Sequence, residues 1–177
     1  MLTGEETATL SAAMDRLEAH ALAHVHLPPR RICLWGHDVH RNSEKGYYAH
    51  GSEGVGNSLI VEDFFNTDPA FDFLVNHPQT MDRICDIVHG PVRINNFELR
   101  VRYEDNAILF TENLLHGGLT NRSEQVRKTL HVGYGPVWVM SQNMATMDEP
   151  QNITEETLAR YDAAQRSLLL LGRQEGH

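Results

Sequence analysis

The sequence predicts an α+β domain in which helices flank a β-rich segment. Residues 92–103 and 126–140 alternate apolar and polar side chains, the pattern of half-buried strands. Residues 4–24 and 155–172 instead repeat their apolar side chains at helical spacing. A chain of 177 residues is long enough to bury one real core, so we expect a single domain.

We divide this domain into three parts. The first, 1–91, is expected to be mainly helical and loop, 92–140 to form the β core, and 141–177 to be a C-terminal helical extension. With 41% hydrophobic and 22% charged residues, the composition is that of a soluble globular protein.

The charge distribution and the termini narrow the class of protein. The net charge is −9 and the basic residues are scattered, which argues against nucleic acid as a partner. The start, MLTGEETATL, has no signal-peptide pattern, and the longest apolar run, Leu168 to Leu171, is too short for a membrane span. We therefore expect a cytoplasmic protein. Cys33 and Cys85 form no metal-binding pattern and are expected to be reduced.

The N-terminal half is predicted as follows. Thr3 and Glu6 form a capping box for a helix over residues 4–24, which ends before Pro28-Pro29. Its apolar stripe is Leu10, Met14, Leu17 and Ala21. Residues 36–57 contain five glycines among polar and aromatic residues, the composition of a long loop.

Further helices and strands are expected after Ser58. The segments SLIVEDFF, PAFDFLVN and PQTMDRICDIVHG predict three short helices. Strands are expected at 92–103, 106–112 and 126–140. Thr154 is the N-cap of a final helix, in which Ile153 and Leu158 form a hydrophobic staple.

One stretch brings two chemically useful residues together. If 106–115 and 126–134 are antiparallel strands joined by a turn, Arg127 lies beside His116. Imidazole is a good ligand for Fe(II), and a guanidinium binds a carboxylate bidentately, so this pair could seat iron and a keto acid. The alternative is a surface hairpin in which Arg127 pairs with Glu124 or solvent and His116 caps a turn.

The same stretch carries a family resemblance. The pattern H-G-x-x-x-N-x-S-x-x-x-R, at His116, Gly117, Asn121, Ser123 and Arg127, resembles the distal half of the active site in the phytanoyl-CoA dioxygenase family. The opening helix, the segment FFNTDPAFDFLVNHPQTMDRICDIVHG and the strand YGPVWVM also resemble parts of such proteins.

The resemblance implies a fold, a reaction and two site residues. Members of the family are Fe(II)- and 2-oxoglutarate-dependent oxygenases that hydroxylate small molecules on a double-stranded β-helix, a jelly-roll fold. His116 would be the distal iron ligand. Arg127 would hold the C5 carboxylate of 2-oxoglutarate. Asn121 and Ser123 would fix the turn between them.

Half of the expected metal site is missing from the sequence. These oxygenases also need an H-x-D or H-x-E pair, but none of the eleven histidines is followed two positions later by Asp or Glu. In the family this pair lies between strands resembling 92–103 and the turn at Glu104-Asp105. We therefore expect an internal deletion, an incomplete β-helix, and self-association through exposed sheet edges.

Other residues were considered as metal ligands. Glu98, Asp105, Glu112 and His131 lie on or between predicted strands, but no sequence rule places them around His116. Two further clusters have a solvent-exposed alternative: His20, His24 and His26, with a zinc-compatible spacing, and His37, Asp38 and His40 in the expected loop. Glu62 and Asp63 are expected to be surface or capping charges of a helix.

Two functions follow. One is a 2-oxoglutarate-dependent oxygenase. The other is a non-catalytic binding or interaction module derived from that family. Because the proximal ligands are absent, the second is favoured for the 177 residues as they stand.

Overall fold

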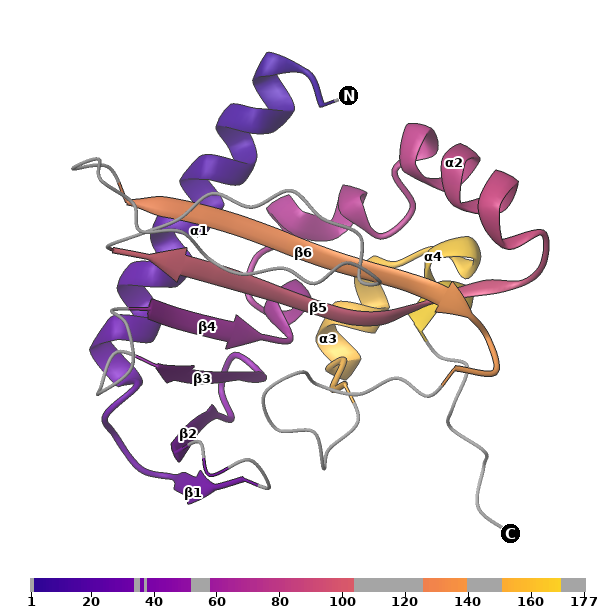
Figure 1. Ribbon diagram of the computed structural model, residues 1–177. Coiled ribbons are helices and arrows are strands. Elements are labelled where there is room, and N and C mark those ends of the chain that lie inside the picture. Colours follow the sequence, from indigo (N-terminus) through magenta and orange to yellow (C-terminus); the bar gives the residue numbers. More distant parts are fainter. Residues whose placement is uncertain are drawn as a thin grey trace, which may run out of the picture.

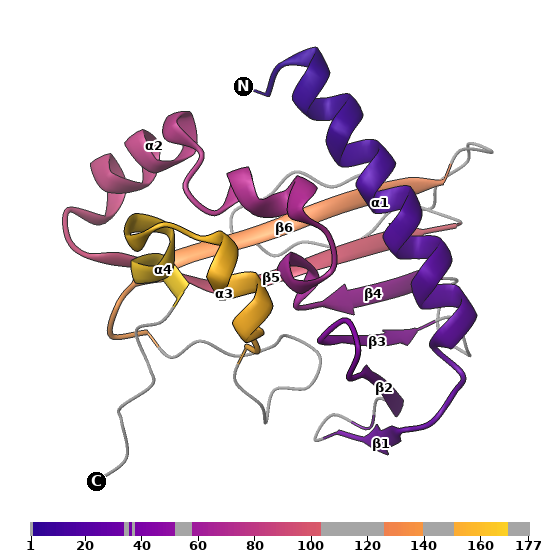
Figure 2. The same ribbon diagram turned by 180° about the vertical axis from the view of Figure 1, so that it is seen from behind.

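The computed structural model describes residues 2–33, 36, 38–51, 58–103, 126–139 and 151–169. These residues form an antiparallel sheet of six strands, which neighbour one another in chain order, with helices packed on one face (Figures 1 and 2). The elements are α1 (Gly4–His24), β1 (Arg30–Ile32), β2 (Asp38–Asn42), β3 (Tyr47–Gly51), β4 (Ser58–Glu62), η1 (Phe64–Asn66), η2 (Pro69–Leu74), α2 (Pro78–Val88), β5 (Val92–Arg102), β6 (Arg127–Pro136), α3 (Glu155–Arg160) and α4 (Ala163–Leu169).

Helix α1 forms as predicted. The Thr3 hydroxyl accepts a hydrogen bond from the Glu6 N–H, and the Glu6 carboxylate accepts one from the Thr3 N–H, so the capping box is confirmed. The buried side of the helix consists of Leu10, Ala13, Leu17 and Ala21. On the same helix Asp15 and Glu18 pair with Lys128 of β6, which joins α1 to the far strand of the sheet.

The loop expected at 36–57 is wrong in part, because β2 and β3 lie within it. Their helix-facing side chains include His40, Asn42 and Tyr47, which are polar yet buried. Buried polar groups on a strand hide the apolar and polar alternation on which sequence recognition depends. The tight turn between these strands is made by Gly46, whose φ of +65° favours glycine.

The helix expected at SLIVEDFF is also wrong. Ser58–Glu62 is strand β4, which places Leu59 and Val61 in the core and Glu62 on the opposite face. Glu62 and Asp63, expected on a helix surface, are instead buried. The next two helical segments are confirmed, as the 3-10 helix η2 and the α-helix α2.

Strands β5 and β6 are confirmed and form the longest pairing in the sheet. They pair from Val92 with Pro136 to Arg102 with Arg127, with one irregularity between Ile94 and Asn96. The predicted strand 106–112 lies outside the described residues. Thr154 caps a helix as predicted, but the final helix is divided into α3 and α4 because Tyr161 is extended, with φ −94° and ψ 141°.

The core lies between the sheet and the helices. An aromatic cluster of Phe64, Phe65, Phe71 and Phe97 occupies its centre, with ring centroids 4.5 to 5.6 Å apart. Figure 2 shows α1, α3 and α4 in front of the sheet on this side. The C-terminal segment supplies three buried side chains to the same core, Leu158, Tyr161 and Leu168. The fold is therefore α+β, as predicted.

The cysteines and the lengths of the helices bear on two further predictions. Cys33 is buried, Cys85 is exposed, and both are free thiols, as predicted. Within the described residues, no helix combines the length and the apolar character that a membrane span requires.

Candidate functional site

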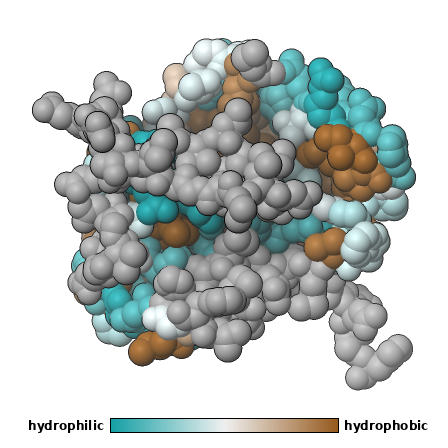
Figure 3. All heavy atoms as spheres, viewed as in Figure 1, coloured by the Kyte–Doolittle hydropathy of each residue, from teal (hydrophilic) through white to brown (hydrophobic). Residues whose placement is uncertain are grey.

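The sheet face opposite the helices carries most of the charged residues of β4, β5 and β6, and we call it the polar face. The strand registers arrange it in three rows. The acidic row is Tyr48, Glu62, Glu98 and His131; the middle row is His50, Ile60, Arg100 and Thr129; the arginine row is Ser58, Arg102 and Arg127. In Figure 3, which looks onto this face, a hydrophilic band is visible over the middle of the sheet.

The acidic row contains two buried carboxylates. Glu62 and Glu98 are directly opposite each other on β4 and β5 and are only 1% and 2% exposed. The Arg100 guanidinium donates to Glu98 Oε1 at 2.6 Å and pairs with that carboxylate. Burying a charge is costly unless it is paired, and the bond from Arg100 provides this pairing for Glu98.

His131 completes the acidic row on β6. Its Nδ1 lies 4.0 Å from Glu98 Oε1. Burial lowers the pKa of His131; the Glu98 carboxylate opposes this shift, while Arg100 and Arg127 add to it. The imidazole is therefore neutral at neutral pH, the form that can accept a hydrogen bond.

The arginine row has an excess of positive charge. Arg102 and Arg127 are directly opposite each other at the ends of β5 and β6. Among the described residues, neither guanidinium has a hydrogen-bond or ion-pair partner. Like charges directly opposite each other on adjacent strands destabilise the pairing, so this position favours an added anion.

Of the two site residues predicted from the sequence, Arg127 and His116, only Arg127 lies among the described residues. Arg127 is the first residue of β6 and its position places it on the polar face. His116 lies outside the described residues. Of the replacement ligands considered, Glu98 and His131 are brought together, whereas Asp105 and Glu112 lie outside the described residues.

An Fe(II) site of the expected kind needs three protein ligands close together. The pair Glu98 and His131 supplies two donors, and no group of three His, Cys, Asp or Glu able to hold a metal exists among the described residues. The part of the chain that the structure describes therefore does not provide an Fe(II) site.

The two other histidine clusters have structural partners. On α1, the rings of His20 and His24 stack at 4.2 Å, and their Nδ1 atoms contact the Tyr47 hydroxyl and the His20 carbonyl, respectively. Asp38 pairs with Arg30, and the buried His40 contacts the Leu27 carbonyl through Nδ1. His37 lies outside the described residues.

Two residues of the polar face, Arg100 and Arg102, were not identified from the sequence. The alternation of Glu98, Arg100 and Arg102 on the predicted strand 92–103 was a signal that these side chains share a face. Glu62 could not be found in this way, because its segment was expected to be a helix.

The resemblance rests on the motif from His116 to Arg127, most of which lies outside the described residues. No protein-family model, curated protein or solved structure matches this chain, so its function is inferred from its own residues.

Proposed function

We propose that this chain is a non-catalytic relative of the Fe(II)- and 2-oxoglutarate-dependent oxygenases that binds a small carboxylate on its polar face. The observation that carries the proposal is the arginine row. Arg102 and Arg127 face each other without an acidic partner among the described residues. A carboxylate between them would replace repulsion by two charge-assisted interactions.

Arginine suits this role better than lysine would. The planar guanidinium presents two parallel N–H donors to the two oxygens of a carboxylate, and it stays charged at any physiological pH. Arg127 is the residue that the family resemblance assigns to the C5 carboxylate of 2-oxoglutarate. The geometry supports that assignment and adds Arg102 as a second cation.

The acidic row sets a limit on the ligand. The acidic and arginine rows are four residues apart along β5 and are therefore separated by about 13 Å. A second carboxylate that reached from the arginine row to Glu62 and Glu98 would be repelled, whereas a hydroxyl or another hydrogen-bond donor would be accepted. Arg100, which lies between the two rows, weakens this repulsion through its pairing with Glu98.

The proposal excludes oxygenase turnover for two reasons. The sequence has no H-x-D or H-x-E pair, and the described residues contain no group of three His, Cys, Asp or Glu able to hold a metal. We assign no chemical step to iron.

The proposed fold is an incomplete double-stranded β-helix. Such a fold needs two sheets that face each other across the ligand. The six-stranded sheet has helices on one face and charged residues on the other, as expected for one of those two sheets. An internal deletion between β5 and β6 would account for the second.

The test compares three variants with the wild-type chain. Binding of 2-oxoglutarate, succinate and acetate is measured by isothermal titration calorimetry without metal. Arg127→Gln and Arg102→Gln should each weaken binding by about ten-fold to a hundred-fold, the effect of losing a hydrogen bond to a charged group. Arg83→Gln, which removes an equal charge from the exposed surface of α2, should bind like wild type.

The free energy of unfolding is a second test, because the arginine substitutions that weaken carboxylate binding should not weaken the fold. Removing one of two facing like charges should leave the unliganded protein as stable as wild type or more stable by about 0.2 to 1 kcal/mol. Absence of carboxylate binding by the wild type would refute the proposal. Succinate release that depends on Fe(II), 2-oxoglutarate and His116 would refute its non-catalytic part.

A further inference from the structure

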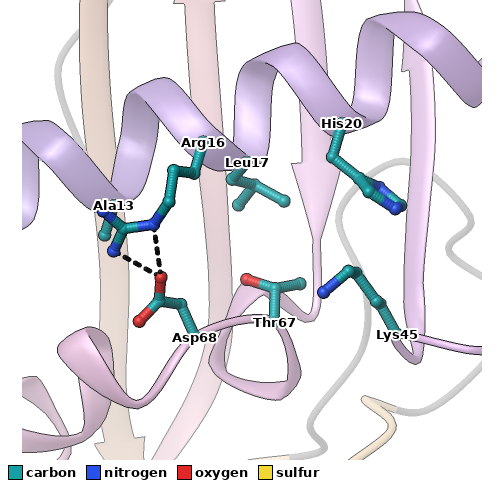
Figure 4. Close-up of a pocket in the computed structure, with 7 residues that line it drawn as sticks. All are labelled: Ala13, Arg16, Leu17, His20, Lys45, Thr67 and Asp68. Atoms are coloured by element: carbon teal, nitrogen blue, oxygen red, sulfur yellow. Dashed lines mark hydrogen bonds and ion pairs between the residues drawn. The ribbon is translucent and has the colours of Figure 1, made fainter.

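A small cavity lies on the other side of the molecule, between α1 and the turns that follow β2 and η1. Its volume is about 210 Å³, and it is lined by Ala13, Arg16, Leu17, His20, Lys45, Thr67 and Asp68. Figure 4 shows that Lys45 and His20 enter it from opposite sides, whereas the Arg16 and Asp68 pair borders it. A cavity smaller than about 300 Å³ suits an ion or a single functional group rather than a whole cofactor.

Asp68 is the carboxylate that lines this cavity, and both of its oxygens already accept hydrogen bonds. Asp68 Oδ2 accepts hydrogen bonds from Arg16 Nε at 3.0 Å and Nη2 at 2.6 Å. The other oxygen, Oδ1, accepts from the Ala70 N–H at 2.9 Å and thereby caps η2. Burial acts to raise the pKa of Asp68, but the hydrogen bonds from Ala70 and Arg16 and the charges of Arg16 and Lys45 hold it below its usual value.

The positive charge of Lys45 is not compensated in the same way. Its backbone N–H binds the Asn42 side chain, but its ammonium group has no ion pair or hydrogen bond among the described residues. The side chain is half-buried and points into the cavity, as Figure 4 shows. Arg16 Nη1, which does not contact Asp68 in the hydrogen bonds above, is a further donor at the border.

His20 is placed to respond to charge in the cavity. Its Nδ1 lies 2.9 Å from the Tyr47 hydroxyl, which leaves Nε2 for another partner. Burial has the largest effect and lowers the pKa of His20, and the charges of His24 and Lys45 lower it further. The Glu44 carboxylate acts in the opposite direction, and His40 lowers the pKa slightly. An anion beside the ring would reverse part of this lowering.

We propose that this cavity binds a small phosphate-like oxyanion, with Lys45 as its principal cation and His20 and Arg16 as further donors. Ala13 and Leu17 supply the apolar part of the lining, between the donors on α1 and Lys45. The site is independent of the polar face, because it lies on α1, on the helix-covered side of the sheet.

The experiment uses inorganic phosphate and methyl phosphate as probes, with wild-type protein at constant ionic strength. Binding is followed by two-dimensional NMR through the Leu17 and Thr67 amides and the His20 imidazole. We expect saturable shifts at these residues and a rise in the pKa of His20. Methyl phosphate distinguishes a phosphoryl group on a larger molecule from the free ion.

Matched variants decide the assignment. Lys45→Met should weaken phosphate binding about ten-fold or more, as expected for a lost charge-assisted bond. Arg83→Met, with the same change in net charge, should retain the wild-type affinity. The proposal is overturned if wild-type protein shows no saturable shifts, or if Lys45→Met binds phosphate as tightly as Arg83→Met.

Discussion

Tyr47 is the most completely buried polar side chain between α1 and the sheet. It has no exposed surface, its hydroxyl contacts His20, and its ring meets the edges of the His20 and His40 rings at 5.7 and 6.4 Å. Burial raises the pKa of Tyr47 to about 12 from an ordinary value of 10.0. The folded protein therefore favours the neutral phenol.

This residue should make the protein sensitive to alkali. Because the folded pKa is raised, the unfolded chain loses its phenolic proton first, and the free energy of unfolding falls as pH rises from 10 to 12. A shift of two pKa units corresponds to about 2 to 3 kcal/mol. Below pH 10 this contribution is fully present.

Tyr47→Phe separates the hydroxyl from the ring. At pH 7 the variant should lose about 1 kcal/mol through the missing hydrogen bond to His20. Between pH 10 and 12 its stability should decline less steeply than that of wild type, as measured by urea unfolding at several pH values. Parallel curves for the two proteins would contradict the role of the phenol.

At the scale of elements, Asn66 joins three segments that are distant in the sequence. Its Nδ2 donates to the Gly46 carbonyl at 2.8 Å and to the Asn152 carbonyl at 2.7 Å. Its Oδ1 accepts from the Thr154 N–H at 2.9 Å. One side chain at the end of η1 thus holds both the turn between β2 and β3 and the start of α3.

Two substitutions at this position should differ in a predictable way. Asn66→Ala removes all three hydrogen bonds and should destabilise the fold by about 2 to 3 kcal/mol. Asn66→Asp keeps the acceptor for Thr154 but loses both donors. Hydrogen exchange at the Thr154 amide should therefore accelerate in Asn66→Ala and stay slower in Asn66→Asp; equal rates would contradict this assignment.

At the scale of the molecule, the C-terminal segment is part of the core. Leu158, Tyr161 and Leu168 are each less than 10% exposed and pack with the aromatic cluster. Burying a large apolar side chain contributes about 1.5 to 3 kcal/mol, and a whole domain is stable by only about 5 to 15 kcal/mol. These three side chains therefore decide whether the domain folds.

Removing residues 151–177 should abolish cooperative unfolding and expose the core. The expected signs are loss of a sigmoidal urea transition and increased binding of an apolar dye. A control that removes only residues 170–177 keeps all three side chains and should unfold cooperatively. If the chain that lacks residues 151–177 unfolded cooperatively with wild-type stability, the sheet and α1 would suffice for folding and the prediction would be wrong.

The fold could be predicted where one local signal dominated. The Thr3 and Glu6 capping box, the Thr154 cap and the alternation in β5 and β6 each specify one structure. Prediction failed at β4, because a run as short as Ser58–Glu62 suits a strand or a buried helix equally. It failed at β2 and β3, because tertiary contacts bury their polar side chains.

The candidate site was predicted less completely than the fold. Arg127 could be identified because it belongs to a motif within a hairpin pattern. Its neighbour Arg102 is 25 positions away in the chain, and only the register of β5 with β6 makes them a pair. No sequence pattern identified Lys45, because the residues that line its cavity come from segments that are distant in the sequence.

The pairing of Arg102 with Arg127 also bears on how such a chain changes in evolution. The segment between them leaves and re-enters the sheet at directly paired positions, so its length is not fixed by the strands on either side. Doubling a flexible connection costs only about 0.6 kcal/mol in closure entropy. Whole strands could be gained or lost here while β1 to β6, α1 and the core kept their places.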